Sequence, residues 1–222
     1  MLNLPRPMFA LAAVFGAVGV ALLTFGVRFA TTGPTPAPVA TLRSIADNDF
    51  GSVPAFALTD QDGKPTTNAD LAGKVWIASF VFTRCNGPCP AVTATVAKLQ
   101  ADLKDVLDVR FVTFTVDPKR DKPEELKRYA ERYGADPAKW LFLTGPQDEL
   151  HTLMVKGFKV HAAAIPNAEP GKEFDHSSRL VLVNKAGTIC GYYEGFPGEH
   201  GEQADFDAGQ ANLKAHVRRL CR

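Results

Sequence analysis

Hydrophobic positions recur along this chain with two different periods, and these periods predict most of its secondary structure. The longest apolar run, residues 75–82, is rich in β-branched and aromatic types and is typical of a buried strand. Directly after it, apolar positions between residues 92 and 103 are spaced by four, three and four, as on one face of a helix. The same reasoning predicts further strands at 56–60, 109–116, 140–143, 179–183 and 188–193, and further helices at 121–134, 146–158 and 206–220.

The order of these elements predicts the fold class. Strands alternate with helices until the last two strands, which are joined by a short turn and should form a hairpin. We therefore expect an α/β domain with a largely parallel central sheet, a closing antiparallel hairpin and helices on both faces. Residues 161–174, rich in Ala, Pro and Gly, are predicted to be irregular.

Two cysteines stand at the junction of the strand 75–82 and the helix that follows it. Cys85 and Cys89 lie in the segment TRCNGPCP, residues 83–90. At a helix N-terminus, unpaired N–H groups and the helix dipole favour negative charge, so a thiolate forms more easily there. Arg84 adds a cation beside the first thiol. The position therefore favours redox or metal chemistry.

The C-x-x-x-C spacing leaves the kind of chemistry open. Residues i and i+4 of a regular helix have Cβ atoms about 5–6 Å apart, whereas a disulfide needs about 3.5–4.5 Å, so a disulfide requires the turn to bend. A bound metal bridges the wider gap, and thiolates are soft ligands that select Cu(I), Zn or iron–sulfur iron. A plain structural disulfide or two buried thiols remain alternatives, and a metal site needs a third ligand.

Composition argues against two classes of protein. The 222 residues carry a net charge of +1 and are 45% hydrophobic, which fits neither a disordered chain nor a nucleic-acid binder. No basic block with interleaved aromatic residues occurs in the sequence. We therefore expect no nucleic-acid partner.

The N-terminal part predicts a membrane anchor. Residues 8–27 carry no charge, and a helix of that length spans roughly 30 Å, the thickness of a bilayer core. A signal-peptide core is usually about 7–15 residues long, so an uncleaved transmembrane helix is favoured over a cleaved signal. The chain is then divided into a cytoplasmic n-region at 1–7, the anchor at 8–27, a Pro/Thr/Ala-rich linker at 28–44 and a single domain at 45–222.

Cysteine usage predicts the compartment. Four cysteines behind an export-type segment suit an oxidising environment, so the domain is expected on the extracytoplasmic side, in a periplasm or intermembrane space. A bond between Cys190 and Cys221 would tie the last helix to the hairpin, and closing a loop of about thirty residues would contribute roughly 3 kcal/mol. The alternative is one buried cysteine and one exposed thiol.

Several motifs together resemble the Sco/SenC family. They are the strand–Thr-x-Cys-x-x-x-Cys-Pro–helix unit, Val-Asp-Pro at 116–118 followed by Arg-Asp at 120–121 and Pro123, Leu-Thr-Gly at 143–145, and Asp-His-Ser at 175–177. The resemblance covers about residues 50–195 in the right order. There are departures: Asn86 stands where the family usually has proline, Gly-Pro-Cys at 87–89 resembles the active site of thioredoxin, and Cys190 and Cys221 lie outside the family pattern.

The resemblance implies a membrane-anchored, thioredoxin-like protein that handles copper for the CuA centre of cytochrome c oxidase. It makes His176 the third ligand beside Cys85 and Cys89, because a thioredoxin-like sheet places the strand after His176 beside the strand before Cys85. Two thiolates and an imidazole suit Cu(I), and also Cu(II) if a further ligand joins. Asp117, at the end of a neighbouring strand, is a candidate for tuning the site by hydrogen bonding, or simply caps a turn.

Two functions follow from this assignment. The leading one is a metallochaperone without catalytic turnover that delivers copper to the CuA-bearing oxidase subunit. The alternative is a thiol–disulfide oxidoreductase in which Cys85 and Cys89 reduce cysteines of the oxidase or of another exported protein. Other copper chaperones or thiol reductants are expected as further partners. A thiol peroxidase is a weaker alternative, and so is a structural zinc site, which would want four ligands.

Overall fold

A computed structural model of the chain describes residues 48–198 and 202–222. The described residues belong to a compact unit that runs from Ile45 to Arg222. The predicted n-region, anchor and linker, residues 1–44, lie outside the described residues. In the described part of the chain, no helix combines the length and hydropathy that crossing a membrane requires.

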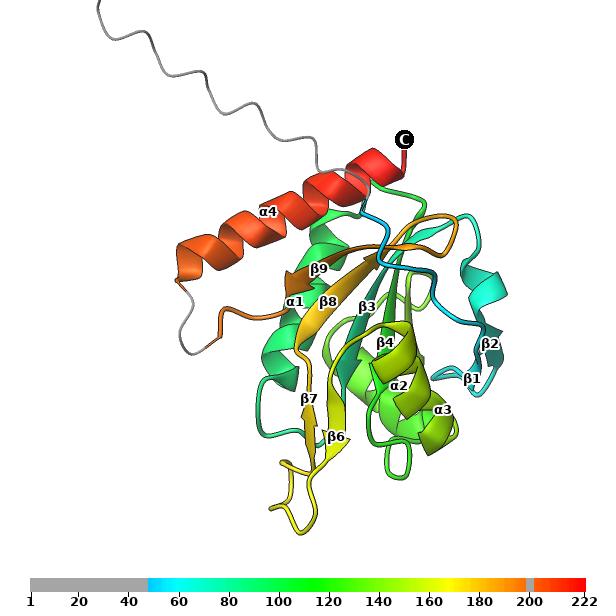
Figure 1. Ribbon diagram of the computed structural model, residues 1–222, viewed down its shortest axis with the longest axis vertical. Coiled ribbons are helices and arrows are strands. Elements are labelled where there is room, and N and C mark those ends of the chain that lie inside the picture. Colours follow the sequence, from blue (N-terminus) through cyan, green and yellow to red (C-terminus); the bar gives the residue numbers. More distant parts are fainter. Residues whose placement is uncertain (1–47, 199–201) are drawn as a thin grey trace, which may run out of the picture. The chain divides into compact units, whose positions relative to one another are not determined.

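A five-stranded sheet with the order β5-β4-β3-β8-β9 forms the centre of the domain (Figure 1). The strands β3 (Val75–Val81), β4 (Val109–Thr115) and β5 (Trp140–Leu143) run parallel, whereas β8 (Arg179–Val183) is antiparallel to β3 and β9 (Ile189–Glu194) to β8. The predicted closing hairpin is therefore confirmed. The sheet is mixed rather than largely parallel, because β8 runs back along β3 from the end where Cys85 lies.

The central position of β3 explains its composition. All seven of its residues are buried, because it has a strand on each side and helices above and below. Trp76 and Phe80 of β3 pack against Phe158 on one face, with ring centroids 5.9 and 5.2 Å apart. Within the buried sheet, the hydroxyl groups of Ser79 and Thr113 form a hydrogen bond of 2.8 Å, so neither is left without a partner. A strand enclosed in this way fixes where the loop after it begins.

Helices cover both faces of the sheet, as predicted. On one face, α1 (Cys89–Asp102) and α2 (Pro123–Arg132) meet through a 2.8 Å hydrogen bond between Thr93 and Tyr129. The last helix, α4 (Gln203–Leu220), packs on β9 and contacts α1 through a 2.7 Å ion pair between Lys214 and Asp102. The other face carries α3 (Gln147–Thr152), which continues as the π-helix η2 (Leu153–Gly157).

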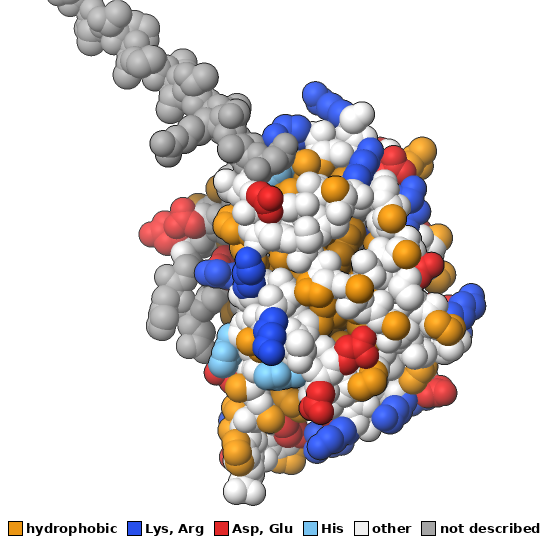
Figure 2. All heavy atoms as spheres, turned by 45° about the vertical axis from the view of Figure 1, so that its right-hand side comes forward, with side chains coloured by type: hydrophobic (Ala, Val, Ile, Leu, Met, Phe, Trp, Pro, Cys, Tyr) orange, Lys and Arg blue, Asp and Glu red, His pale blue; other side chains and the backbone are white. Residues whose placement is uncertain are grey.

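The remaining elements are short. The antiparallel pair β1 (Ala57–Thr59) and β2 (Pro65–Thr67) encloses the predicted Asp-Gly turn, and the 3₁₀-helix η1 (Asn68–Leu71) leads into β3. On the face shown in Figure 2, acidic and basic side chains are interspersed among hydrophobic ones. This face of the described residues therefore presents no charged patch of a single sign.

One segment differs from its sequence prediction. The predicted irregular stretch 161–174 contains a strand, β6 (Ala162–Ala164), that pairs antiparallel with β7 (Phe174–His176). Residues 162–176 thus form a two-stranded arm, which projects from the lower end of the sheet in Figure 1. The sequence does not reveal β6, because three alanines have neither the alternation nor the β-branched types that indicate a strand.

Candidate metal centre

The loop after β3 carries the first candidate ligand. This cysteine loop, residues 82–88, joins Val81 at the end of β3 to Cys89 at the start of α1. The Cys85 N–H donates to the Phe82 carbonyl over 3.2 Å, and the Gly87 N–H donates to Cys85 Sγ over 3.3 Å. Cys85 is half-buried, whereas Cys89 is fully buried. The first sulfur is thus accessible and the second is covered.

A buried carboxylate anchors this loop to the rest of the domain. Asp121 accepts hydrogen bonds from the Thr83 hydroxyl at 2.6 Å, the Thr83 N–H at 3.1 Å and the Thr115 hydroxyl at 2.5 Å. Burial raises the pKa of Asp121, although these donors oppose the shift. The sequence places Asp121 at the start of the predicted helix 121–134 and in the Arg-Asp motif at 120–121. In the structure the N-cap of α2 is Lys122, and Asp121 holds the cysteine loop instead.

His176 reaches the cysteines from the end of the arm. Its Nε2 lies 3.3 Å from Cys89 Sγ, and its Nδ1 lies 3.1 Å from the Ser177 carbonyl oxygen. A carbonyl can only accept, so Nδ1 donates to Ser177, and Nε2 is the ring nitrogen that faces the sulfur. The edge-on ring of Phe82, 5.9 Å away between centroids, packs against the imidazole. The orientation is that of an imidazole prepared to coordinate a metal through Nε2.

The structure brings the three predicted ligands together. One ligand atom each of Cys85, Cys89 and His176 lies within 4.8 Å of the other two. The antiparallel pairing of β8 with β3 produces this arrangement, because it places the arm beside the cysteine loop at one end of the sheet. Two sulfurs and one imidazole nitrogen form a soft donor set of the type that favours Cu(I).

The two thiols of this cluster titrate differently. The hydrogen bond from the Cys89 thiol lowers the pKa of Cys85, and the backbone N–H of Gly87 acts in the same direction. The pKa of Cys89 is raised, because its proton is held in that bond and because the side chain is buried. Cys85 is therefore the thiolate of the metal-free cluster, and the more nucleophilic sulfur near neutral pH.

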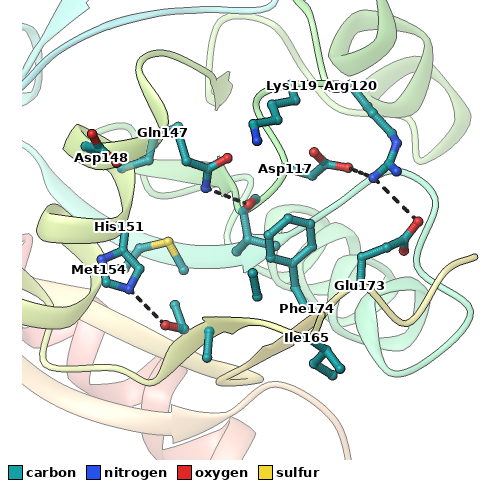
Figure 3. A pocket seen from close by; sticks show the side chains of 15 residues that line it. Asp117, Lys119, Arg120, Gln147, Asp148, His151, Met154, Ile165, Glu173 and Phe174 are labelled. Carbon is teal, nitrogen blue, oxygen red and sulfur yellow. Dashed lines mark hydrogen bonds and ion pairs between the residues drawn. The ribbon is translucent and has the colours of Figure 1, made fainter. Parts of the chain in front are cut away.

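Asp117 does not join the cluster directly. Its buried carboxylate accepts a 2.8 Å hydrogen bond from Arg120, which also reaches Glu173 of the arm at 3.4 Å. Figure 3 shows these ion pairs on the wall of a cavity of about 570 Å³ between α3 and the arm. Asp117 therefore acts on the arm through Arg120.

The predicted disulfide between Cys190 and Cys221 is not formed, and Cys221 is a free cysteine. The predicted packing of the last helix on the hairpin is nevertheless present, since α4 contacts β9. Cys190 is buried in β9 and donates to the Thr188 carbonyl over 3.4 Å. Cys221 lies at the C-cap of α4 near Lys185, and partial burial raises its pKa. The last helix therefore packs on the hairpin without a disulfide between Cys190 and Cys221.

Comparison with known proteins places these features in a family context. A sequence model of the SCO1/SenC family matches residues 46–204. A SCO1 protein homolog of Bacillus subtilis (strain 168) is 39% identical over 145 residues, which cover 64% of this chain and 74% of that protein. Two solved structures are similar to this chain in fold as well as in sequence.

The first is BsSco, studied for a disulfide switch and described as a member of the Sco family of cytochrome c oxidase assembly proteins. It is 32% identical, with a TM-score of 0.65 over 78% of this chain and 96% of BsSco. The second is yeast Sco1 with copper bound, 27% identical, with a TM-score of 0.60 over 76% of this chain and 89% of that one. Both support a thioredoxin-like fold of the Sco type for the described domain.

Proposed function

The chain belongs to the SCO1/SenC family, and on that premise we propose that it is a metallochaperone that binds copper and delivers it to the CuA centre of cytochrome c oxidase during assembly. The observation that carries the proposal is the convergence of Cys85, Cys89 and His176 within 4.8 Å. Copper bound to yeast Sco1 and the assignment of BsSco to oxidase assembly support it. Copper is the cargo, so no turnover of a substrate is required.

The donor set suits a cargo that must be held and then released. Two soft thiolates hold Cu(I), and the imidazole nitrogen adds the borderline ligand that Cu(II) needs. Cys89 is fully buried and would keep the ion attached, whereas the half-buried Cys85 offers a side from which an acceptor thiolate can approach. Transfer then proceeds by ligand exchange, with acceptor ligands replacing those of the chaperone one at a time.

A second function, thiol–disulfide exchange, is favoured by the lowered pKa of Cys85. The Cys85 thiolate would attack a partner disulfide and release one partner thiolate, which takes up a proton. The Cys89 thiol would lose its proton and attack Cys85 of the mixed disulfide, releasing the second partner thiol. The partner is reduced and the cysteine pair is oxidised, so each cycle needs an external thiol reductant.

We further propose that residues 8–27 anchor the protein and that the domain faces the extracytoplasmic side. The uncharged length of that segment and the use of cysteines support this placement. The full-length protein should stay with membranes after alkaline washing. A mature N-terminus within residues 31–40 would show cleavage instead and would overturn the anchor.

Copper loading of the full-length protein tests the main proposal. Metal content and absorption spectra should be measured after Cu(I) and Cu(II) loading, beside Cys85→Ser, Cys89→Ser and His176→Ala. Transfer should then be followed to a CuA-bearing oxidase subunit with reduced cysteines. Stoichiometric binding that depends on all three residues, followed by transfer, supports a chaperone. Reduction of an oxidised oxidase subunit without copper transfer would favour the second function.

A further inference from the structure

One residue of the cysteine loop, Asn86, holds the tip of the arm that carries His176. Asn86, the residue after Cys85, donates its backbone N–H to the Gly171 carbonyl over 3.1 Å. Its side-chain Nδ2 donates to the neighbouring Pro170 carbonyl over 3.0 Å. One residue of the cysteine loop thus satisfies two successive carbonyls near the tip of the arm.

The opposite side of this contact is shaped to receive Asn86. Gly171 is buried, although the residues beside it in the arm are exposed. Its φ is +89°, and a Cβ there would lie 2.3 Å from Asn86 Nδ2 and 2.9 Å from the Arg84 carbonyl oxygen. Only glycine accommodates both this backbone conformation and this close approach. The contact is therefore specific in shape as well as in hydrogen bonding.

Other contacts hold the base of the arm but not its tip. Phe174 packs on Phe82 with ring centroids 5.4 Å apart. Glu173 lies 3.4 Å from Arg120 and accepts a 2.7 Å hydrogen bond from the Gly171 N–H. Within the arm, β6 and β7 pair over only three residues each. A two-stranded ribbon is marginally stable by itself, so its orientation depends on its contacts with the domain.

We propose that Asn86 is a positioning residue that fastens the arm to the cysteine loop and so holds His176 at the copper site. This inference rests on the proposed function. Asn86 acts through its contact with Gly171, which lies five residues before His176 in the arm, and it does not contribute a ligand atom. A proline at this position would have neither of the two donors, so the attachment is a property of the asparagine in this chain.

The proposal predicts which copper chemistry should change. Loosening the arm moves the imidazole relative to the sulfurs but leaves both thiolates in place. Cu(II), which needs the nitrogen ligand, should therefore be affected more than Cu(I), which the two thiolates hold. One lost hydrogen bond corresponds to about a five-fold change in an equilibrium constant. We expect Cu(II) affinity to fall about 5-fold in Asn86→Ala and about 20-fold in Asn86→Pro.

The first measurement uses the metal-free, full-length protein. Hydrogen exchange of the Asn86 amide and trypsin cleavage after Lys172, an exposed arm residue, report directly on the attachment. Cleavage should accelerate in Asn86→Ala, more so in Asn86→Pro, and also in Gly171→Ala, which breaks the contact from the arm side. Asn212→Ala, which removes an exposed amide on α4, should match the wild type. Unchanged cleavage in all three variants, together with unchanged exchange of the residue-86 amide in Asn86→Ala and Gly171→Ala, would overturn the proposal.

The second measurement separates positioning from general destabilisation. Cu(II) and Cu(I) affinities should be measured for Asn86→Pro and Gly171→Ala, alone and combined with His176→Ala. If Asn86 acts through His176, neither change weakens Cu(II) binding further once the imidazole is gone. Equal weakening in both backgrounds would contradict the positioning role.

The outcome for His176→Ala alone distinguishes the two proposals. If His176→Ala weakens Cu(II) binding while Asn86→Pro and Gly171→Ala do not, the proposed copper site stands and the role of Asn86 is wrong. If His176→Ala itself leaves Cu(II) binding unchanged, the ligand assignment is wrong, and the inference about Asn86 falls with it.

Discussion

Two pairs of cysteines in one domain have opposite surroundings. Cys85 and Cys89 flank a helix N-terminus, share a hydrogen bond and meet a histidine, and the pKa of Cys85 is lowered. Cys190 lies within a strand and Cys221 at a helix C-cap, where partial burial raises the pKa of Cys221. The Cys89 thiol donates to Cys85 and lowers its pKa, whereas burial raises the pKa of Cys221. The groups around each sulfur, rather than cysteine content, therefore distinguish the reactive thiol from the packing thiols.

Removal of single sulfurs should show the largest contrast between the two pairs. Removing a group that only hydrogen-bonds to a metal ligand lowers metal affinity by about 10–100-fold. Cys85→Ser and Cys89→Ser remove a ligand itself, so each should lower Cu(I) affinity by more than about 100-fold. Cys190→Ser and Cys221→Ser should bind Cu(I) like the wild type. Competition with a Cu(I) chelator measures the Cu(I) affinity of all four variants. Wild-type affinity in Cys85→Ser or Cys89→Ser would contradict the difference between the two cysteine pairs.

His176→Ala should show an intermediate effect that depends on the oxidation state. We expect about 100-fold weaker Cu(II) binding but only about 10-fold weaker Cu(I) binding, because two thiolates satisfy Cu(I) better than Cu(II). Titration of each ion, with the Cu(II) absorption spectrum as the second readout, checks this. Equal losses for both ions would show that the imidazole is not a selective ligand. His161→Ala is the matched control, because His161, just before the arm, is exposed and pairs with the exposed Asp175.

The pH dependence of alkylation sharpens the comparison further. A thiol with a lowered pKa stays ionised at pH values below the pKa of an ordinary cysteine. A thiol with a raised pKa is ionised only at more alkaline pH. At pH 6, reduced metal-free protein should therefore react with iodoacetamide at Cys85 more than about 10-fold faster than at Cys221. The ratio of the Cys85 rate to the Cys221 rate should fall as the pH rises, because Cys221 then ionises as well. Once both thiols are ionised, the thiolate with the lower pKa is the weaker nucleophile. Peptide mass spectrometry gives both rates, and a ratio independent of pH would contradict the assignment.

The smallest effects concern stability in the second pair. Cys190 is 1% exposed in the core, so Cys190→Ser should lower the free energy of unfolding by about 1–3 kcal/mol, because it replaces a buried sulfur by a more polar hydroxyl. Cys221→Ser should change it by less than about 0.5 kcal/mol. Urea denaturation under reducing conditions measures both. A large loss in Cys221→Ser would show that this thiol has a structural role.

Elements with a local, periodic pattern of apolar residues could be predicted from the sequence. The run that became β3 and the four-three-four spacing that became α1 each indicate their own structure, so the cysteine loop between them could be placed. His176 was assigned through the family resemblance, because only the pairing of β8 with β3 brings it near the cysteines. No local segment of the sequence indicates the order of the strands in the sheet.

The missed features depend on contacts between distant segments. Asp121 begins a predicted helix, but its carboxylate holds Thr83 across the end of the sheet. Asn86 looked like a departure from the family pattern, and its partners lie about 85 residues further along the chain. Neither residue type indicates such a partner, since an Asp or Asn beside a turn usually serves that turn.

The pairing of Trp76 in β3 with Val183 in β8 also determines when the site forms during folding. The two cysteines are neighbours in any conformation of the chain, but His176 joins them only after this long loop has closed. Contacts so far apart in sequence form slowly, because loop closure costs entropy before any contact is gained. An unfolded chain would thus offer copper two thiols, and the folded chain offers a third ligand. Copper should therefore stabilise the native state only by the difference between these two affinities.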